Sequence, residues 1–312
     1  MKKWMITALS CAAIGSLFCA GTALAVSNDP ERLLSWPTVT IGINNKTALM
    51  SIEHDSMDED KNSRQEQEAA SDSQHFANDK VHDLSDHHNI SNIYIDSSIG
   101  NVVIEKSNRF EMVTNNGDYS DDNTSLYDFS ITNDTLSVDM TAVNLPFGNP
   151  SSPELKIYVP FDLNTIEVEV NAGSVILKGF KSNRISASVD MGNILTDNIK
   201  AESLNADCNA GDIEIQKSHF KTMSLNNDAG NINFDGTVSD SLNSDLAMGN
   251  ITIDLHQRID RENSSINAHS DLGNVSIRPN SVSDLKQKML PPVPLNIDIQ
   301  VSLGEIKLSY QD

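Results

Sequence analysis

Apolar and polar residues alternate along much of the chain between residue 91 and the C-terminus, and single glycines interrupt the alternation. In the stretch LNADCNAGDIEIQ, residues 204–216, the alternation runs up to Gly211 and restarts beyond it in a shifted phase. Alternation at period two indicates a strand with one inward face. A single glycine between two such strands predicts a corner, because glycine tolerates backbone conformations that other residues avoid.

These glycines recur with a fixed spacing. Five are evenly spaced, each at position i+19 from the one before, and three follow the same pattern at longer intervals. The regular five are Gly173, Gly192, Gly211, Gly230 and Gly249, and the others are Gly100, Gly273 and Gly304. When the eight segments are aligned on their glycines, the positions seven before, two after and four after are apolar, with Thr196 the single departure. The residue that follows the glycine is mostly Asn or Asp, both of which suit corners.

The repeat predicts a fold. A unit of this length with two short strands cannot bury its own apolar face, whereas stacked units can. We therefore predict an all-β fold, a single-stranded right-handed parallel β-helix (a β-solenoid) with coils of roughly 19 residues and the eight glycines as corners. A β-propeller needs about 40–45 residues per blade. An immunoglobulin-like sandwich does not require equal spacing or a repeated glycine.

The outward positions support stacking in this register. Four residues before the glycine, successive coils alternate charged with neutral side chains, as in Asp207, Asn226 and Asp245. Like charges directly opposed on neighbouring strands are destabilising, so this alternation predicts that residues i and i+19 lie side by side.

Residues 105–165 break the 19-residue period. They carry three further predicted strands, at Leu126–Ile131, Leu136–Met140 and Leu155–Val159, which we interpret as wider coils or an excursion near the N-terminal end.

The N-terminal part of the chain has a different composition. Residues 1–25 have the features of a cleaved signal peptide: Lys2 and Lys3, an apolar stretch, and a small-residue cleavage site at Ala23–Ala25. Residues 26–52 are predicted to form an N-terminal strand or cap segment. Residues 53–90, with 11 Asp/Glu against 3 Lys/Arg and five histidines, are predicted to form an acidic flexible segment. Residues 91–312 form the predicted solenoid domain.

Charge and cysteine content narrow the possible partners. The net charge is −22, and removal of Lys2 and Lys3 with the signal peptide takes it to −24. Such a surface repels nucleic acid and anionic lipid and favours cations or basic partners. No later segment approaches the roughly 20 apolar residues of a membrane-spanning helix, so no stable span is expected after cleavage.

After cleavage of the signal peptide Cys208 remains the sole cysteine, and its place three residues before a corner glycine predicts a small buried residue. Asn227 has the same place in the next coil and must find hydrogen bonds there.

Three consecutive runs resemble a known family. The runs are LKIYVP at Leu155–Pro160, IEVEV at Ile166–Val170 and GSVIL at Gly173–Leu177. Together with the repeated glycine pattern over residues 91–312, they resemble exported bacterial domains of unknown function that are provisionally named adhesins. The resemblance implies a right-handed β-helix and an export route. It implies no catalytic residues.

Few residues of the sequence suggest a metal-binding or catalytic site. His82, His87 and His88 stand beside acidic residues, in a combination that can bind Zn²⁺ or Ni²⁺, although a solvated polar linker is the simpler interpretation. The acidic columns offer oxygen ligands for Ca²⁺, but the repetitive calcium-binding nonapeptide is absent. Carboxylates are spread so regularly that they mark no single catalytic site.

The sequence therefore favours an acidic, exported, periplasmic or extracellular protein without a cofactor. We expect a non-enzymatic binding or structural module of the cell envelope, adhesin-like, whose partner is an unknown protein or glycan and not a nucleic acid. Two alternatives stay open. One is an enzyme acting on envelope polysaccharide, and the other is a surface protein that depends on calcium or another metal.

Overall fold

The computed structural model describes residues 79–117, 126–140, 152–280 and 292–311. The predictions for the signal peptide, the N-terminal strand or cap segment and most of the acidic segment lie outside these residues. Within the described ranges the chain forms nineteen strands and no helix. The strands are β1 (Lys80–Asp83), β2 (Asn92–Ser97), β3 (Asn101–Lys106), β4 (Glu111–Asn115), β5 (Tyr127–Thr132), β6 (Thr135–Met140), β7 (Glu154–Val159), β8 (Leu163–Ala172), β9 (Val175–Lys178), β10 (Lys181–Met191), β11 (Ile194–Asp197), β12 (Lys200–Ala210), β13 (Ile213–Ala229), β14 (Ile232–Met248), β15 (Ile251–Arg258), β16 (Ser265–Leu272), β17 (Val275–Asn280), β18 (Asn296–Leu303) and β19 (Ile306–Gln311).

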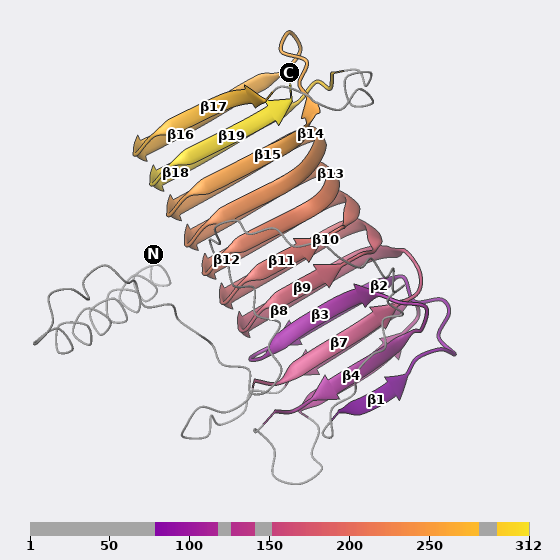
Figure 1. The fold of residues 1–312 in the computed structure, drawn as a ribbon. Coiled ribbons are helices and arrows are strands. Elements are labelled where there is room, and N and C mark those ends of the chain that lie inside the picture. The colour runs from indigo at the N-terminus through magenta and orange to yellow at the C-terminus, as the bar shows by residue number, and fades with distance from the viewer. Residues whose placement is uncertain (1–78, 118–125, 141–151, 281–291, 312) are drawn as a thin grey trace, which may run out of the picture. The chain divides into compact units, whose positions relative to one another are not determined.

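The strands from β8 to β15 stack as parallel rungs (Figure 1). Ile185 on β10 lies beside Ile166 on β8 and beside Leu204 on β12. Asp207 likewise lies between Ser188 and Asn226, so positions i and i+19 are neighbours, as the alternating columns predicted. The prediction of an all-β fold built from stacked parallel strands is confirmed. The right-handed winding stays a prediction.

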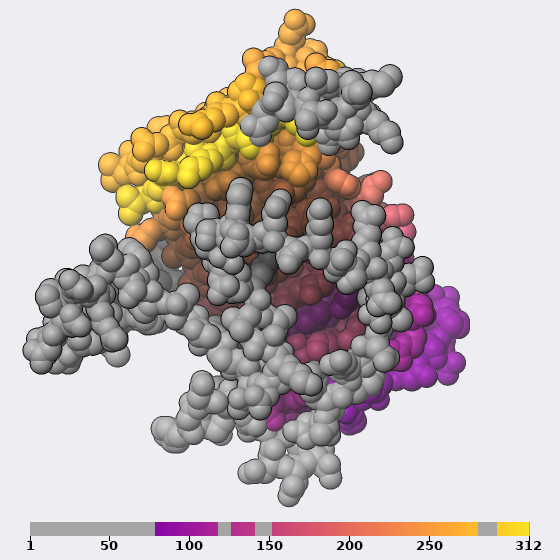
Figure 2. Space-filling view, in the orientation of Figure 1, coloured from indigo at the N-terminus to yellow at the C-terminus, as the bar shows by residue number. Residues whose placement is uncertain are grey.

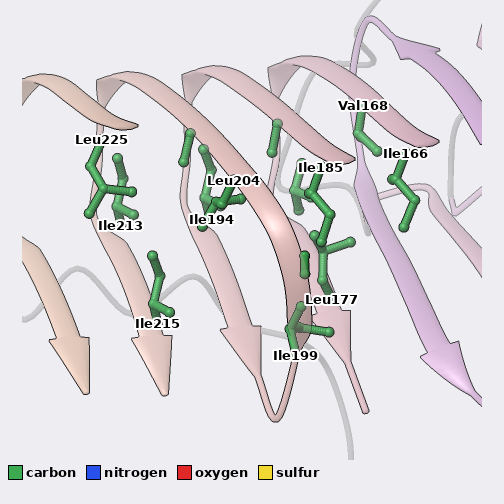
Figure 3. Close-up of a cluster of buried hydrophobic side chains, with 14 of the residues drawn as sticks. Ile166, Val168, Leu177, Ile185, Ile194, Ile199, Leu204, Ile213, Ile215 and Leu225 are labelled. Carbon is green, nitrogen blue, oxygen red and sulfur yellow. The ribbon is translucent and has the colours of Figure 1, made fainter. Parts of the chain in front are cut away.

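Inward side chains fill the space between the two strand layers of the stack (Figure 3). They come from the period-two positions of the sequence, and Ile185, Ile194 and Ile213 are each fully buried. At about 25 cal/mol per Å² of apolar surface removed from water, this continuous core supplies the main stabilising term. The described residues contain one cysteine, Cys208, which is free, so no disulfide contributes.

The glycine corners stack directly on one another. All eight predicted corner glycines have positive φ, from +109° at Gly100 to +158° at Gly273. A Cβ placed on Gly211 would lie 1.7 Å from the carbonyl oxygen of Gly192, one coil earlier. No side chain fits at that separation. The column therefore needs glycine both for its backbone conformation and for the close approach of successive coils.

Three successive coils have a second corner, which lies after β9, after β11 and within β13. Its residue, six positions after the glycine, is Gly179, Asn198 or Lys217, with φ of +74°, +55° and +48°. Glycine and asparagine adopt this left-handed conformation at low cost, whereas a lysine there is unusual. The sequence pattern did not single out this corner, although Gly179 and Asn198 are residues typical of it.

The N-terminal end of the stack is built from the irregular region. β6 and β7 continue the parallel stack beyond β2 and β3, while β5 pairs antiparallel with β6 and β4 with β7. The three strands predicted in residues 105–165 match β5, β6 and β7 to within a residue at each end. One prediction needs correction here. Within residues 79–90, Lys80–Asp83 form β1, which pairs with β4, and both Leu84 and Ile90 are buried, so this part of the predicted flexible segment packs on the domain.

The C-terminal coils are stacked out of sequence order. β18 pairs with β14 on one side and with β16 on the other, and β19 lies in the same way between β15 and β17. The chain thus passes over one coil position, forms β16 and β17, and returns to fill the position between. Figure 2 shows this arrangement as a yellow segment between two orange ones. In the terminal coil the inward residues Val275 and Ile277 are each 42% exposed, because no further coil among the described residues covers them.

Candidate interaction surface

A row of apolar side chains, most of them exposed, runs along the stack, one residue before each corner glycine from Gly173 onwards. We call this row the apolar ridge. It consists of Ala172, Met191, Ala210, Ala229, Met248, Leu303 and Leu272, in spatial order. Met191 and Met248 are both 56% exposed, and Leu272 is 69% exposed. Seven adjacent strands at about 4.8 Å spacing give the ridge a length of about 29 Å.

The corner geometry explains why these apolar residues face outward. In β10 the inward positions are Ile185, Ala187 and Val189, and simple alternation would bury Met191 as well. The chain bends at Gly192, however, so Asp190 and Met191 are both exposed. Alternation alone therefore assigns the ridge position to the core. The sequence signal that marks it is its place directly before a glycine corner.

Acidic and amide side chains border the ridge on both sides, and hydrogen bonds hold them in place. On one side, the Asn209 side-chain amide donates to Asp190 Oδ1 on the preceding coil at 2.8 Å. On the other side, the backbone N–H of Asp212 donates to Asn193 Oδ1 at 2.9 Å, and that of Asn231 donates to Asp212 Oδ1 at 2.7 Å. The ridge is thus an apolar strip with a fixed, negatively charged border.

A shallow hollow of about 330 Å³ lies on β10, β12, β13 and β14, several residues before the ridge positions of these strands. Small polar side chains line it, with Ser186, Asn205, Ser224 and Asn243 in one column and Arg184 beside them. Neither a carboxylate nor an imidazole is among its lining residues. The hollow therefore offers hydrogen bonds to a polar ligand.

The three histidines that the sequence suggested as metal ligands, His82, His87 and His88, form no common group of ligands among the described residues. His82 lies on β1, where its ring packs edge-on against Phe129 with 4.9 Å between ring centroids. Burial, with a smaller contribution from Lys80, lowers the pKa of His82. His87 and His88 are exposed in the turns that follow β1. In the described part of the chain, the one group of three metal-ligating side chains is Asp235, Asp254 and His256, which the motifs of the sequence do not mark.

Cys208 and Asn227 occupy the core positions that the sequence predicted. Cys208 is 2% exposed, its thiol donates to the carbonyl oxygen of Gly192 at 3.3 Å, and burial raises its pKa to about 11. A thiol with so high a pKa and so little exposure is a poor nucleophile. Asn227 is 4% exposed, and both ends of its amide are hydrogen-bonded.

The fold and this surface define a solenoid of stacked parallel β-coils with an exposed apolar strip. Residues 90–289 match the family model described as Toastrack DUF4097, and the chain belongs to that family. This membership bears out the resemblance to a family of domains of unknown function. None of the described residues forms a helix that is long and apolar enough to cross a membrane.

Three solved structures are similar to this chain. One is a protein from Bacteroides fragilis provisionally named an adhesin, with 13% identity, a TM-score of 0.49, and coverage of 75% of this chain and 98% of that one. Another is a Clostridium sporogenes protein provisionally named for cell adhesion, with 11% identity, a TM-score of 0.31, and coverage of 75% and 99%. The third is a Parabacteroides distasonis protein provisionally named lipid-binding, with 13% identity, a TM-score of 0.33, and coverage of 76% and 97%. No curated protein matches the sequence.

Proposed function

We propose that this chain is an exported, non-enzymatic binding module of the cell envelope, located in the periplasm or outside the cell. In this proposal the 91–312 domain is a right-handed solenoid with one copy of the glycine repeat in each regular coil, and the apolar ridge is its binding surface. The observation that carries the proposal is the exposure of Met191, Met248 and Leu272 in one continuous row. Contiguous exposed apolar surface of this kind marks interaction sites on soluble proteins.

The border of the ridge indicates the kind of partner. Asp190, Asp212 and their neighbours place negative charge along the strip, and the whole chain has a net charge of −22. The complementary surface is a protein with an apolar groove bordered by Lys and Arg side chains. Charge complementarity of this type steers association and is weakened by salt.

Site-specific photo-crosslinking in cells tests the proposal. A benzoylphenylalanine placed at Met191 is expected to capture a specific envelope protein. The same probe at Thr252, which is exposed outside the ridge, serves as the control. With the captured partner purified, a Met191→Gln, Met248→Gln double variant should bind about 10- to 100-fold more weakly than wild type, since two methionine side chains no longer gain apolar burial. Crosslinking from Thr252 alone would contradict the proposal.

A glycan is the second candidate partner, and the polar hollow favours it. The hydroxyl groups of Ser186 and Ser224 line the hollow together with the Asn205 amide, which also donates to Asp207 Oδ2 at 2.6 Å. In a glycan-array assay, binding lost in Asn205→Ala but kept in the methionine double variant would assign the function to the hollow. The appearance of new reducing or unsaturated ends in incubated polysaccharide would instead support an enzyme.

A further inference from the structure

Three potential metal ligands converge on the outer face where β14 and β15 pair. Asp235 lies directly opposite Asp254 in the sheet register. His256 follows two residues after Asp254, so both side chains project from the same face of β15. The His256 Nε2 atom lies 3.6 Å from Asp235 Oδ2 and 3.6 Å from Asp254 Oδ2. One ligand atom from each residue lies within 4.8 Å of the others.

These separations fit a shared ion better than direct hydrogen bonds. An N–H···O hydrogen bond spans about 2.7–3.2 Å, and the imidazole stands farther than that from both carboxylates. In a tetrahedral site with bonds of about 2.1 Å, two ligand atoms lie about 3.4 Å apart. Two carboxylates directly opposed on neighbouring strands also repel each other. A cation held between them removes that repulsion.

A neighbouring hydroxyl group orients one of the two carboxylates. The Ser309 hydroxyl on β19 donates to Asp254 Oδ1 at 2.8 Å, which leaves Oδ2 available for an ion. A hydrogen bond to the second oxygen of a ligating carboxylate is a usual feature of metal sites. Asp235 Oδ1 is shielded from solvent and has no hydrogen-bond partner in the described part of the chain. The three side chains are between 43% and 46% exposed, so water can complete the coordination.

We propose that Asp235, Asp254 and His256 bind a divalent transition-metal ion of the Zn²⁺ type, with water as the remaining ligand. One imidazole and two carboxylates suit Zn²⁺, Ni²⁺ or Cu²⁺, whereas Ca²⁺ takes six to eight oxygen ligands. The ion joins two successive coils. Because it binds the folded chain, it raises the melting temperature of the protein. This site is independent of the proposed binding function of the apolar ridge.

Calorimetric titration of the full chain with ZnCl₂ at pH 7.5 tests the proposal. Wild type is compared with His256→Gln and Asp235→Asn, each of which should lose one equivalent of Zn²⁺ or bind it at least tenfold more weakly. His269→Gln is the matched control, because within the described structure His269 contacts one carboxylate, that of Asp271, at 3.0 Å. It should retain wild-type binding. Histidines elsewhere in the chain contribute equally to all the variants, so the difference isolates the site.

Two further measurements keep the result decisive. Zn²⁺ should raise the melting temperature of wild type and His269→Gln but not of His256→Gln, while all metal-free melting temperatures agree within about 3 °C, as expected for surface substitutions. Asp96→Asn, in an acidic column where Asp96 lies between Asp139 and Glu169, controls for general attraction of cations. Zn²⁺ binding by His256→Gln that equals wild type, or an equal loss in Asp96→Asn, would overturn the proposal.

Discussion

The side-chain amide of Asn227 donates a 2.8 Å hydrogen bond to the carbonyl oxygen of Gly211, at the corner one coil earlier. The Asn227 Oδ1 atom accepts a 3.0 Å hydrogen bond from the backbone N–H of Ala229. Cys208 makes the equivalent contact from its thiol to Gly192, one coil nearer the N-terminus. The residue three positions before a corner glycine thus contacts the preceding corner from inside the core, and in Asn227 it forms a polar link between coils.

Removal of that link should destabilise the domain. Asn227→Ala leaves the Gly211 carbonyl and the Ala229 N–H without these buried partners, so we expect a loss of about 1–3 kcal/mol in the free energy of unfolding. Asn226→Ala is the matched control, because Asn226 is exposed and its amide donates to Asp207 at the surface. Its cost should stay below about 0.5 kcal/mol. Urea denaturation followed by circular dichroism measures both, and equal costs would show that the buried link contributes nothing.

Gly211→Ala should be more damaging than Gly179→Ala, although both glycines have positive φ. A Cβ at Gly211 meets the Gly192 carbonyl oxygen at 1.7 Å, whereas one at Gly179 approaches nothing closer than 3.4 Å. Gly179→Ala therefore carries only backbone strain of about 1–2 kcal/mol. Gly211→Ala must also push two coils apart, and we expect a cost above about 4 kcal/mol, or loss of folding. Denaturation midpoints of the two variants provide the comparison. Similar midpoints would mean that the stacked corners separate easily.

Thr196→Val should stabilise the protein. Thr196 is 3% exposed in an otherwise apolar column, beside Leu177 and Ile215, and its hydroxyl has no hydrogen-bond partner in the described structure. Valine has the same shape without the buried hydroxyl, so the free energy of unfolding should rise by about 1 kcal/mol. The expected signature is a higher urea midpoint with an unchanged slope. A lower midpoint would indicate that the hydroxyl is satisfied in solution.

Cys208 should make stability fall at alkaline pH. Burial raises the thiol pKa from 9.0 to about 11, so the folded chain holds this proton more tightly than the unfolded chain does. Its contribution is complete below pH 9 and is lost as the pH rises from about 9 to about 11. The difference in unfolding free energy between wild type and Cys208→Ala should shrink over that range. As an independent check, native protein should react with a thiol reagent at pH 8 at least 100-fold more slowly than urea-unfolded protein. Equal rates would contradict the burial.

Much of the regular stack follows from local pattern. Ile185, Leu204 and Met223 are neighbours because the same short motif recurs at a constant interval, and parallel pairing in register is the arrangement that buries all three. The prediction weakens where the intervals change. Nothing in the spacing shows that β18 inserts between β14 and β16, because the order of coils separated by irregular segments depends on which edges pair in three dimensions.

The candidate sites depended still more on tertiary structure. Alternation predicts that Met191 is buried in the core, and only the bend at Gly192 turns its side chain outward. Asp235 and His256 lie on different strands, and the pairing of β14 with β15 brings them together. The histidines that stand close in sequence, His87 and His88, form no such group within the described residues.

The sequence by itself determined the all-β class, the inward and outward positions of the regular strands, the corner glycines and the lateral neighbours within the regular repeat. These features are set by local alternation and by a constant interval. The tertiary structure alone decided the order of the last coils, the antiparallel N-terminal end, the exposure of the apolar ridge and the convergence of Asp235, Asp254 and His256. Each of these depends on where the chain bends and which distant edges meet, and a one-dimensional pattern of apolar and polar residues carries neither.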